Sequence, residues 1–176
     1  MKKDNRQKVL SVFFDDPTQE AFQLREISRK INLAPKSVKT YLDELEKGNL
    51  ITKSKHRIHA YPTYSANRDN DYFRFLKKID TITTIKECGL LDYLNSNCMP
   101  DAVILFGSAS KGEDVKGSDI DLFLLCKQKE LALEKYEKIL SRKINVFFTE
   151  NFNNISKELK NNVLNGTILS GYLKVF

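Results

Sequence analysis

The chain has few residues of the kinds that build metal clusters or disulfide frameworks, with three cysteines and two histidines among 176 residues. Cys88, Cys98 and Cys126 are odd in number and lack the paired short spacings of a zinc site, which predicts reduced structural thiols. His56 and His59 lie three residues apart in a predicted hairpin, where we expect them to face opposite ways. The cysteine and histidine pattern therefore predicts neither a zinc site nor a disulfide framework.

Long apolar runs are also missing. No run approaches the length of a membrane span, and the first six residues, MKKDNR, are not followed by the apolar core of a signal peptide. There is no internal repeat and no low-complexity tract. With 41% hydrophobic and 30% charged residues, the composition is that of a globular protein of one domain or two small ones. We expect a cytoplasmic location and no membrane contact.

Acidic residues do not balance the basic ones in the first third of the chain. Residues 1–65 contain 13 lysines and arginines against 8 acidic residues, whereas residues 66–176 contain 16 against 15. The net charge of +6 is therefore concentrated at the N-terminal end. A basic region of this kind is suited to contacts with nucleic-acid phosphates.

Residues 103–125 contain the pattern with the most chemistry. Four apolar strand formers end at Gly107-Ser108, where a helix could begin, so a phosphate near Gly107 would meet N–H donors and no side chain. Asp119 and Asp121 precede a second apolar run, and because side chains alternate along a strand, both must point to the same face. Two such carboxylates need a shared proton or cation. Mg²⁺ is the expected cation, since it takes carboxylate, water and phosphate oxygens.

Two other site types fit these residues poorly. The glycine spacing of residues 107–112 is that of a P-loop, but Glu113 and Asp114 follow where lysine and a hydroxyl residue are required. A calcium loop beginning at Asp119 would need polar ligands and a glycine where Phe123 and Leu124 stand. A surface turn followed by a strand with merely solvated aspartates remains the alternative.

A family resemblance rests on these residues: Gly107-Ser108, Gly112 and Ser118-Asp119-x-Asp121-Leu122. They resemble the signature of the DNA polymerase beta-like nucleotidyltransferases, in particular the minimal type. The resemblance implies that Gly107 and Ser108 hold the phosphates of a nucleoside triphosphate, with ATP the expected one. It also implies that Asp119 and Asp121 ligate the metals, with a third acidic residue on a later strand. Lys111 and Ser118 complete the expected nucleotide site, although Lys111 also fits an ordinary surface position.

The chain departs from this family pattern at Asn145, on a strand predicted at residues 144–149. An amide oxygen can coordinate a hard cation but is neutral, so one metal of a two-metal Mg²⁺ site loses much of its anchorage. We therefore predict nucleotide binding with slow or absent turnover unless another acid substitutes. Glu150 is nearest in sequence, but its strand parity is opposite to that of Asn145.

Residues 24–45, LREISRKINLAPKSVKTYLDEL, lead through the LEKGNLI of residues 45–51 into a hairpin. This pattern resembles the helix-turn-helix of winged-helix DNA-binding domains. Helices are predicted at residues 6–14 and 24–31 and from Pro35 to Gly48, followed by a strand from residue 50, a turn at 53–57 and a returning strand at 58–64. The third helix and the hairpin tip supply the expected DNA contacts: Lys36, Ser37, Lys39, Thr40, Lys53, Lys55 and Arg57. Winged helices also serve as protein docking or dimerisation units, which is the alternative.

The whole chain is predicted to be α+β. We expect a winged helix-turn-helix at residues 1–65, connecting helices at 66–100 and a nucleotidyltransferase-like mixed sheet, with helices packed on one face, at 101–176. Further helices are predicted at residues 72–88, 90–94, 127–140 and 151–164, while residues 167–176 have no settled prediction. The helix at 72–88 is expected to pack on its own domain, with a homodimer interface as the alternative.

Overall fold

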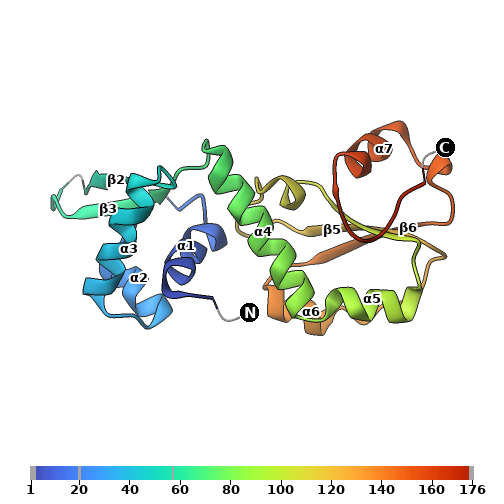
Figure 1. Cartoon of the computed structure of the whole chain (residues 1–176), viewed down its shortest axis with the longest axis horizontal. Helices are drawn as coiled ribbons and strands as arrows, with labels where there is room; N and C mark the ends of the chain where they lie inside the picture. Colours follow the sequence, from blue (N-terminus) through green and yellow to red (C-terminus); the bar gives the residue numbers. More distant parts are fainter. Residues whose placement is uncertain (1–2, 20, 57, 175–176) are drawn as a thin grey trace. The chain divides into compact units, whose positions relative to one another are not determined.

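The computed structural model describes residues 3–19, 21–56 and 58–174 of the chain. The chain divides into two compact units, Met1–Lys77 and Lys78–Phe176, and the division falls inside the long helix α4 (Asp71–Glu87), drawn in green in Figure 1. Each unit has its own hydrophobic core. Within the described ranges, no helix combines the length and the apolar character that crossing a bilayer requires.

Besides the start of α4, the described residues of the first unit form three helices and a small antiparallel sheet. The helices are α1 (Asn5–Asp15), α2 (Leu24–Ile31) and α3 (Pro35–Lys47). The strands are β1 (Phe22–Gln23), β2 (Ile51–Lys55) and β3 (Pro62–Ala66), in the order β1-β3-β2. The prediction of three helices and a hairpin is confirmed, except that the returning strand begins four residues later than expected.

Local sequence explains where these helices begin. Asp4 caps α1 reciprocally: its carboxylate accepts from the Gln7 N–H at 2.7 Å, and the Gln7 side chain accepts from the Asp4 N–H at 3.1 Å. Pro35 occupies the first position of α3, where its missing N–H is not needed. Val38 and Leu42 on the inner face of α3 are fully buried, which ties the helix to the core.

At the hairpin tip, the prediction that His56 and His59 face opposite ways is wrong. The His56 and His59 rings stack at 5.2 Å between centroids instead of facing opposite ways, and Tyr61 stacks on His56 at 4.6 Å. The strands end at Lys55 and begin again at Pro62, so these residues lie in a turn, where strand alternation does not apply. The Ala60 N–H donates to the His56 carbonyl at 3.0 Å and folds the turn back on itself.

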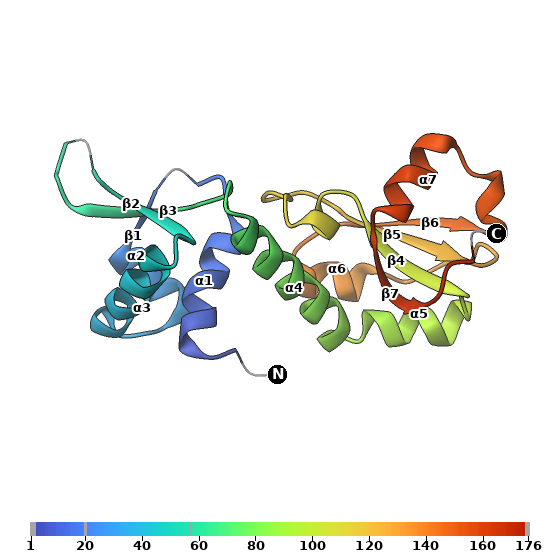
Figure 2. The same cartoon turned by 45° about the horizontal axis from the view of Figure 1, so that its top comes forward.

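The second unit is built on a four-stranded mixed sheet in the order β6-β5-β4-β7 (Figure 2). The strands are β4 (Ala102–Phe106), β5 (Ile120–Leu125), β6 (Ile144–Thr149) and β7 (Thr167–Gly171). β5 pairs antiparallel with β4 and parallel with β6, and β4 pairs antiparallel with β7. The predicted mixed sheet is confirmed, and β7 accounts for part of the final segment, for which no element was predicted.

Helices cover both faces of this sheet, so the expectation of helices on one face is wrong. One face packs against α4, α5 (Leu90–Cys98) and α6 (Glu134–Leu140). The other face, with Ile104 and Phe123, packs against α7 (Lys157–Leu164) and the 3-10 helix η2 (Phe152–Asn154), and Figure 2 shows α7 across the sheet from α5 and α6. The reason is that every residue of β4 is apolar and buried, so both of its faces need cover.

Three further segments differ from the predicted elements. The helix expected at 127–140 begins only at Glu134, because the preceding segment bonds to α5: the Ala132 N–H donates to the Tyr93 hydroxyl at 2.9 Å. The helix expected at 151–164 is divided into η2 and α7, and Ser156 caps α7. After Gly107-Ser108, only the three-residue 3-10 helix η1 (Ala109–Lys111) forms.

The three cysteines form no disulfide among the residues that the structure describes. Cys88, Cys98 and Cys126 are free thiols, and Cys98 is buried. Burial, followed by the neighbouring Cys98, raises the pKa of Cys126 to about 11. The Cys126 thiol therefore stays protonated and unreactive at neutral pH.

Candidate functional site

Asp119, Asp121 and Asn145 lie together at one end of the sheet of the second unit. Asp121 on β5 is in register with Asn145 on β6, and Asp119 lies two residues before Asp121. The Asn145 Nδ2 donates to Asp119 Oδ2 at 3.2 Å and to Asp121 Oδ1 at 3.0 Å. Two carboxylate oxygens thus converge on one donor atom, as the expected strand alternation and strand pairing require.

Gly107 leaves the space that the Asp121 carboxylate occupies. Phe106, the last residue of β4, pairs with Asp121, and Gly107 turns away with φ +71°, a conformation that favours glycine. A Cβ at Gly107 would overlap Asp121 Oδ2. The glycine is thus required by the carboxylate as well as by the phosphate expected beside it.

The other predicted nucleotide-binding residues lie around the same turn. Ser108 is half-buried, and its carbonyl accepts from the Lys111 and Glu113 N–H groups at 3.1 and 3.0 Å. Lys111 is exposed at the end of η1. The Ser118 hydroxyl accepts from the Val115 N–H at 3.0 Å, so this side chain closes the loop before β5. Contacts of these residues with nucleotide stay a prediction.

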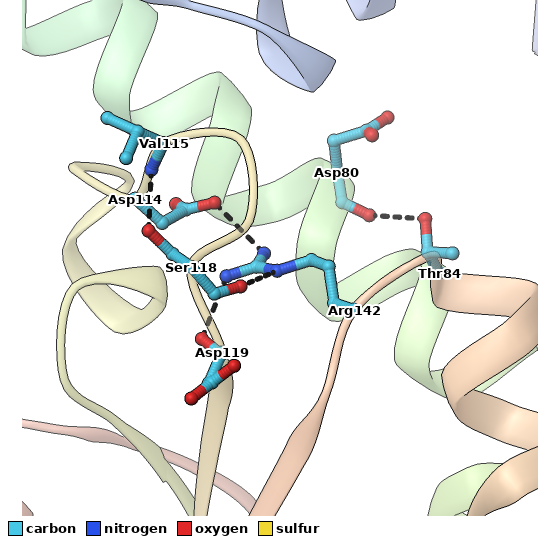
Figure 3. A network of polar contacts seen from close by, with 7 residues as sticks. All are labelled: Asp80, Thr84, Asp114, Val115, Ser118, Asp119 and Arg142. Atoms are coloured by element: carbon cyan, nitrogen blue, oxygen red, sulfur yellow. Dashed lines mark hydrogen bonds and ion pairs between the residues drawn. The ribbon is translucent and has the colours of Figure 1, made fainter.

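Arg142 clasps the loop that carries Asp119, and sequence reasoning missed it. Its Nε donates to the Ser118 carbonyl at 2.7 Å, and the two remaining nitrogens donate to Asp114 Oδ2 and to the Asp119 carbonyl, each at 2.9 Å. Figure 3 shows the guanidinium between Asp114 and the Ser118–Asp119 backbone. The Asp114 side chain is 4% exposed. An arginine two residues before the predicted strand was the only signal available in the sequence.

The start of β6 is held by a second set of contacts. The Ile120 N–H donates to the Lys143 carbonyl at 2.8 Å, which joins β5 to the residue before β6. The Ile144 N–H donates to Glu137 Oε1 at 3.1 Å, and Lys143 Nζ lies 3.2 Å from Glu137 Oε2. The Ile144 N–H, followed by Lys143, lowers the pKa of the Glu137 carboxyl. Asn145 is therefore positioned by contacts from both β5 and α6.

The residues at this site fit one magnesium ion. Asp119 and Asp121 present convergent anionic oxygens, and the Asn145 N–H₂ group donates a hydrogen bond to each of them. Rotation of the Asn145 amide would present its oxygen instead. Within the described residues, no cluster of three or more histidines, cysteines or acids is present.

An open hollow of about 400 Å³ lies beside α6 and the start of β6, away from the paired aspartates. Its lining mixes both signs of charge: Glu134, Glu137, Lys138, Ser141, Arg142 and Lys143. Arg142 and Glu137 are already engaged with the β5 loop and with β6. We therefore base the site on the convergence of carboxylates rather than on this hollow.

The predicted DNA-contacting residues of the first unit fall into two groups. Lys36, Ser37, Lys39 and Thr40 are all exposed on α3, on either side of the buried Val38. Lys53 is turned toward the acidic end of α3, where its Nζ lies 3.9 Å from Asp43 Oδ1 and 3.6 Å from Glu46 Oε2. Lys55 is exposed, and Arg57 lies outside the described residues.

Comparison with known families gives one match. Residues 89–171 match the family model described as polymerase beta, nucleotidyltransferase. No curated protein matches the chain. The matched range covers most of the second unit and includes Gly107, both aspartates and Asn145. For this range the match supports the family-level prediction: residues 89–171 are similar to the nucleotidyltransferase domain of the DNA polymerase beta-like superfamily.

Proposed function

We propose that the second unit transfers a nucleoside monophosphate from a nucleoside triphosphate, with ATP the expected donor, to an acceptor hydroxyl. The observation that carries this proposal is the convergence of Asp119 and Asp121 on one atom beside Gly107, inside the range that matches the family. In the reaction, the acceptor oxygen bonds to the α-phosphorus while the bond from that phosphorus to pyrophosphate breaks, and the acceptor proton leaves.

Each residue has a separate task. Asp119 and Asp121 would hold Mg²⁺, which would neutralise triphosphate charge and stabilise the departing pyrophosphate. The backbone at Gly107 and Ser108 holds the phosphate tail, with Lys111 and Ser118 beside it. Gly107 also leaves room for the Asp121 carboxylate, because a side chain at position 107 would displace it.

Asn145 limits the rate. Its amide is neutral and has no basic atom at neutral pH, so it neither anchors a second metal strongly nor takes the acceptor proton. The family pattern implies a third acidic metal ligand at this place. The proposed consequence is nucleotide binding with slow or absent turnover, unless another acid substitutes.

We further propose that the first unit is a winged helix that binds duplex DNA. Its three helices and hairpin, the exposed polar residues of α3 and the excess of basic residues support this role. The proposed contacts come from Lys36, Ser37, Lys39, Thr40, Lys53, Lys55 and Arg57. Protein docking and homodimer formation are the alternatives, which the acidic end of α3 favours.

A second candidate function is a DNA-binding regulator whose nucleotidyltransferase domain binds nucleotide with little or no turnover. One contact favours it: the Asn145 amide bridges both carboxylates, which keeps them paired without a bound cation. In that case the nucleotide would be a regulatory ligand, and the protein would have no acceptor substrate.

Incubation with each α-labelled nucleoside triphosphate and Mg²⁺ or Mn²⁺, alone and with cell extract, tests the proposal. Pyrophosphate release and label transfer are scored for the wild type and for a variant with Asp119→Asn and Asp121→Asn. Metal-dependent transfer by the wild type alone supports the enzyme. Thermal stabilisation by Mg²⁺-nucleotide without transfer supports the regulator, since a ligand that binds only the folded state raises its melting temperature. Neither response, or equal responses in the double variant, would contradict both.

A further inference from the structure

An exposed aromatic ring lies on the same sheet face as the carboxylate pair. Strands β5 and β6 pair in parallel register, Asp121 with Asn145 and Phe123 with Phe147. Because side chains alternate along a strand, Phe147 shares the face of Asn145, about 6.6 Å further along β6. The Phe147 side chain is 43% exposed, although it lies beside a site formed by polar groups.

The protein fixes this ring on one side and leaves it open on the other. Phe147 meets the buried Phe106 in an edge contact, with centroids 5.5 Å apart and planes at 68°. On the neighbouring strand Phe123 is fully buried and is covered by Phe152 of η2 at 6.0 Å. The cover of this face thus includes Phe123 but leaves much of Phe147 open.

The reaction geometry separates the groups around the α-phosphorus. In-line displacement places the acceptor and the pyrophosphate on opposite sides of it. If the phosphate tail lies at Gly107, after β4, as proposed above, the displacement axis would run across the strands from β6 toward β4. The ribose ester would then lie off that axis, and the exposed Phe147 ring lies further along β6 from Asn145.

We propose that Phe147 is the stacking surface for the nucleobase of the bound nucleoside triphosphate, an inference that rests on the proposed function. A ligand that combines a metal-bound triphosphate with a flat apolar ring matches a carboxylate pair followed by an open aromatic ring. Stacking uses the face of the base and not its hydrogen-bonding edge. The subsite therefore accepts all four bases and binds purines more tightly than pyrimidines.

The absence of tryptophan from the chain allows a direct test. Phe147→Trp introduces a single tryptophan, whose emission is titrated with Mg²⁺-ATP and with Mg²⁺-tripolyphosphate, a probe that lacks a base. We expect saturable quenching by ATP and none by tripolyphosphate, although both raise the melting temperature. Ile139→Trp is the matched control, because Ile139 is an exposed residue of α6, on the opposite side of the sheet, and its emission should respond to neither.

Phe147→Ala provides the second measurement. It should weaken ATP binding roughly tenfold, within the range for loss of one base–aromatic stack, and leave tripolyphosphate binding unchanged. If ATP raises the wild-type melting temperature but the emission of the Phe147→Trp variant is silent and Phe147→Ala binds ATP normally, the stacking inference is wrong and nucleotide binding stands. If neither probe binds the wild type, the proposed function fails and the inference fails with it.

Discussion

The two units of this chain use polar residues in opposite ways. The first unit holds 16 basic against 10 acidic residues, and the second holds 13 of each. Lys36 and Lys39 of the first unit project from the outer side of α3, where side chains are exposed. In the second unit, Arg142 and Asn145 are bonded to the segments that carry the paired aspartates.

This difference predicts how each unit responds to change. An exposed lysine acts through its charge, so its removal alters salt-dependent binding and leaves stability nearly unchanged. A polar group that is bonded on several sides acts through position, so its removal alters both the fold and the site. The predictions below test this contrast, in order of decreasing expected effect.

Arg142→Ala should produce the largest loss. It removes three hydrogen bonds, one of them to the buried Asp114 carboxylate, and we expect the free energy of unfolding to fall by about 3 kcal/mol. Urea unfolding measures the loss. The adjacent Lys143→Ala is the control, since the Lys143 side chain is 76% exposed and should contribute less than about 0.5 kcal/mol. Similar losses in both variants would show that the Arg142 hydrogen bonds do not stabilise the loop before β5.

Gly107→Ala should cost stability and also remove nucleotide binding. A residue with a side chain is strained at φ +71° by about 1–3 kcal/mol, and the added Cβ displaces the Asp121 carboxylate. Gly117→Ala is a matched control, because Gly117 has φ +82° with nothing within 4 Å of an added Cβ. Thermal melts with and without Mg²⁺-ATP should show strain in both variants but loss of the ligand shift only in Gly107→Ala. Retention of that shift would contradict the proposed site.

Asn145→Asp should lower the stability of the metal-free protein and strengthen metal binding. It replaces the bridging N–H₂ group with a third carboxylate, so like charges repel and the metal-free melting temperature should fall. Added Mg²⁺ should then raise the melting temperature more than in the wild type, and transferase activity should rise while nucleotide affinity changes little. A fully active wild type with an impaired Asn145→Asp variant would show that the third ligand lies elsewhere.

Lys36→Ala with Lys39→Ala should leave stability within about 0.5 kcal/mol and weaken DNA binding. Each lost phosphate contact should reduce the dependence of log K on log salt by about 1. Lys53→Ala should weaken binding less than Lys55→Ala, because Lys53 is held by Asp43 and Glu46. Titration of the full chain with duplex DNA at several salt concentrations measures both effects. No binding at low salt would favour the protein-docking alternative.

The smallest effect concerns pH and Glu137. The Ile144 N–H and Lys143 lower the pKa of this carboxyl in the folded protein, so its contribution to stability is present above the pKa of the unfolded chain. That contribution is lost as the pH falls toward the lowered, folded-state pKa. Glu137→Gln should therefore make the free energy of unfolding fall slightly less steeply as the pH is lowered. Urea unfolding at steps of about one pH unit, from about pH 7 to about pH 3, measures this change. An unchanged acid limb would show that the contact is too weak to matter.

Much of the site could be predicted because its information is local. Two aspartates two residues apart before an apolar run must share a strand face, and the strand at residues 144–149 was predicted with its observed limits. The helix α2 likewise begins and ends where its sequence pattern predicts. The family match agrees with this local pattern.

The amino-acid sequence by itself determined most of the elements, the shared face of Asp119 and Asp121 and the basic first unit, because periodicity and charge are properties of short segments. Only the tertiary structure decided that helices cover both sheet faces and that Arg142 reaches the Asp119 loop. It also decided that the Asn145 amide bridges the two carboxylates. These features depend on contacts between segments more than twenty residues apart, and no local pattern specifies which distant groups will meet.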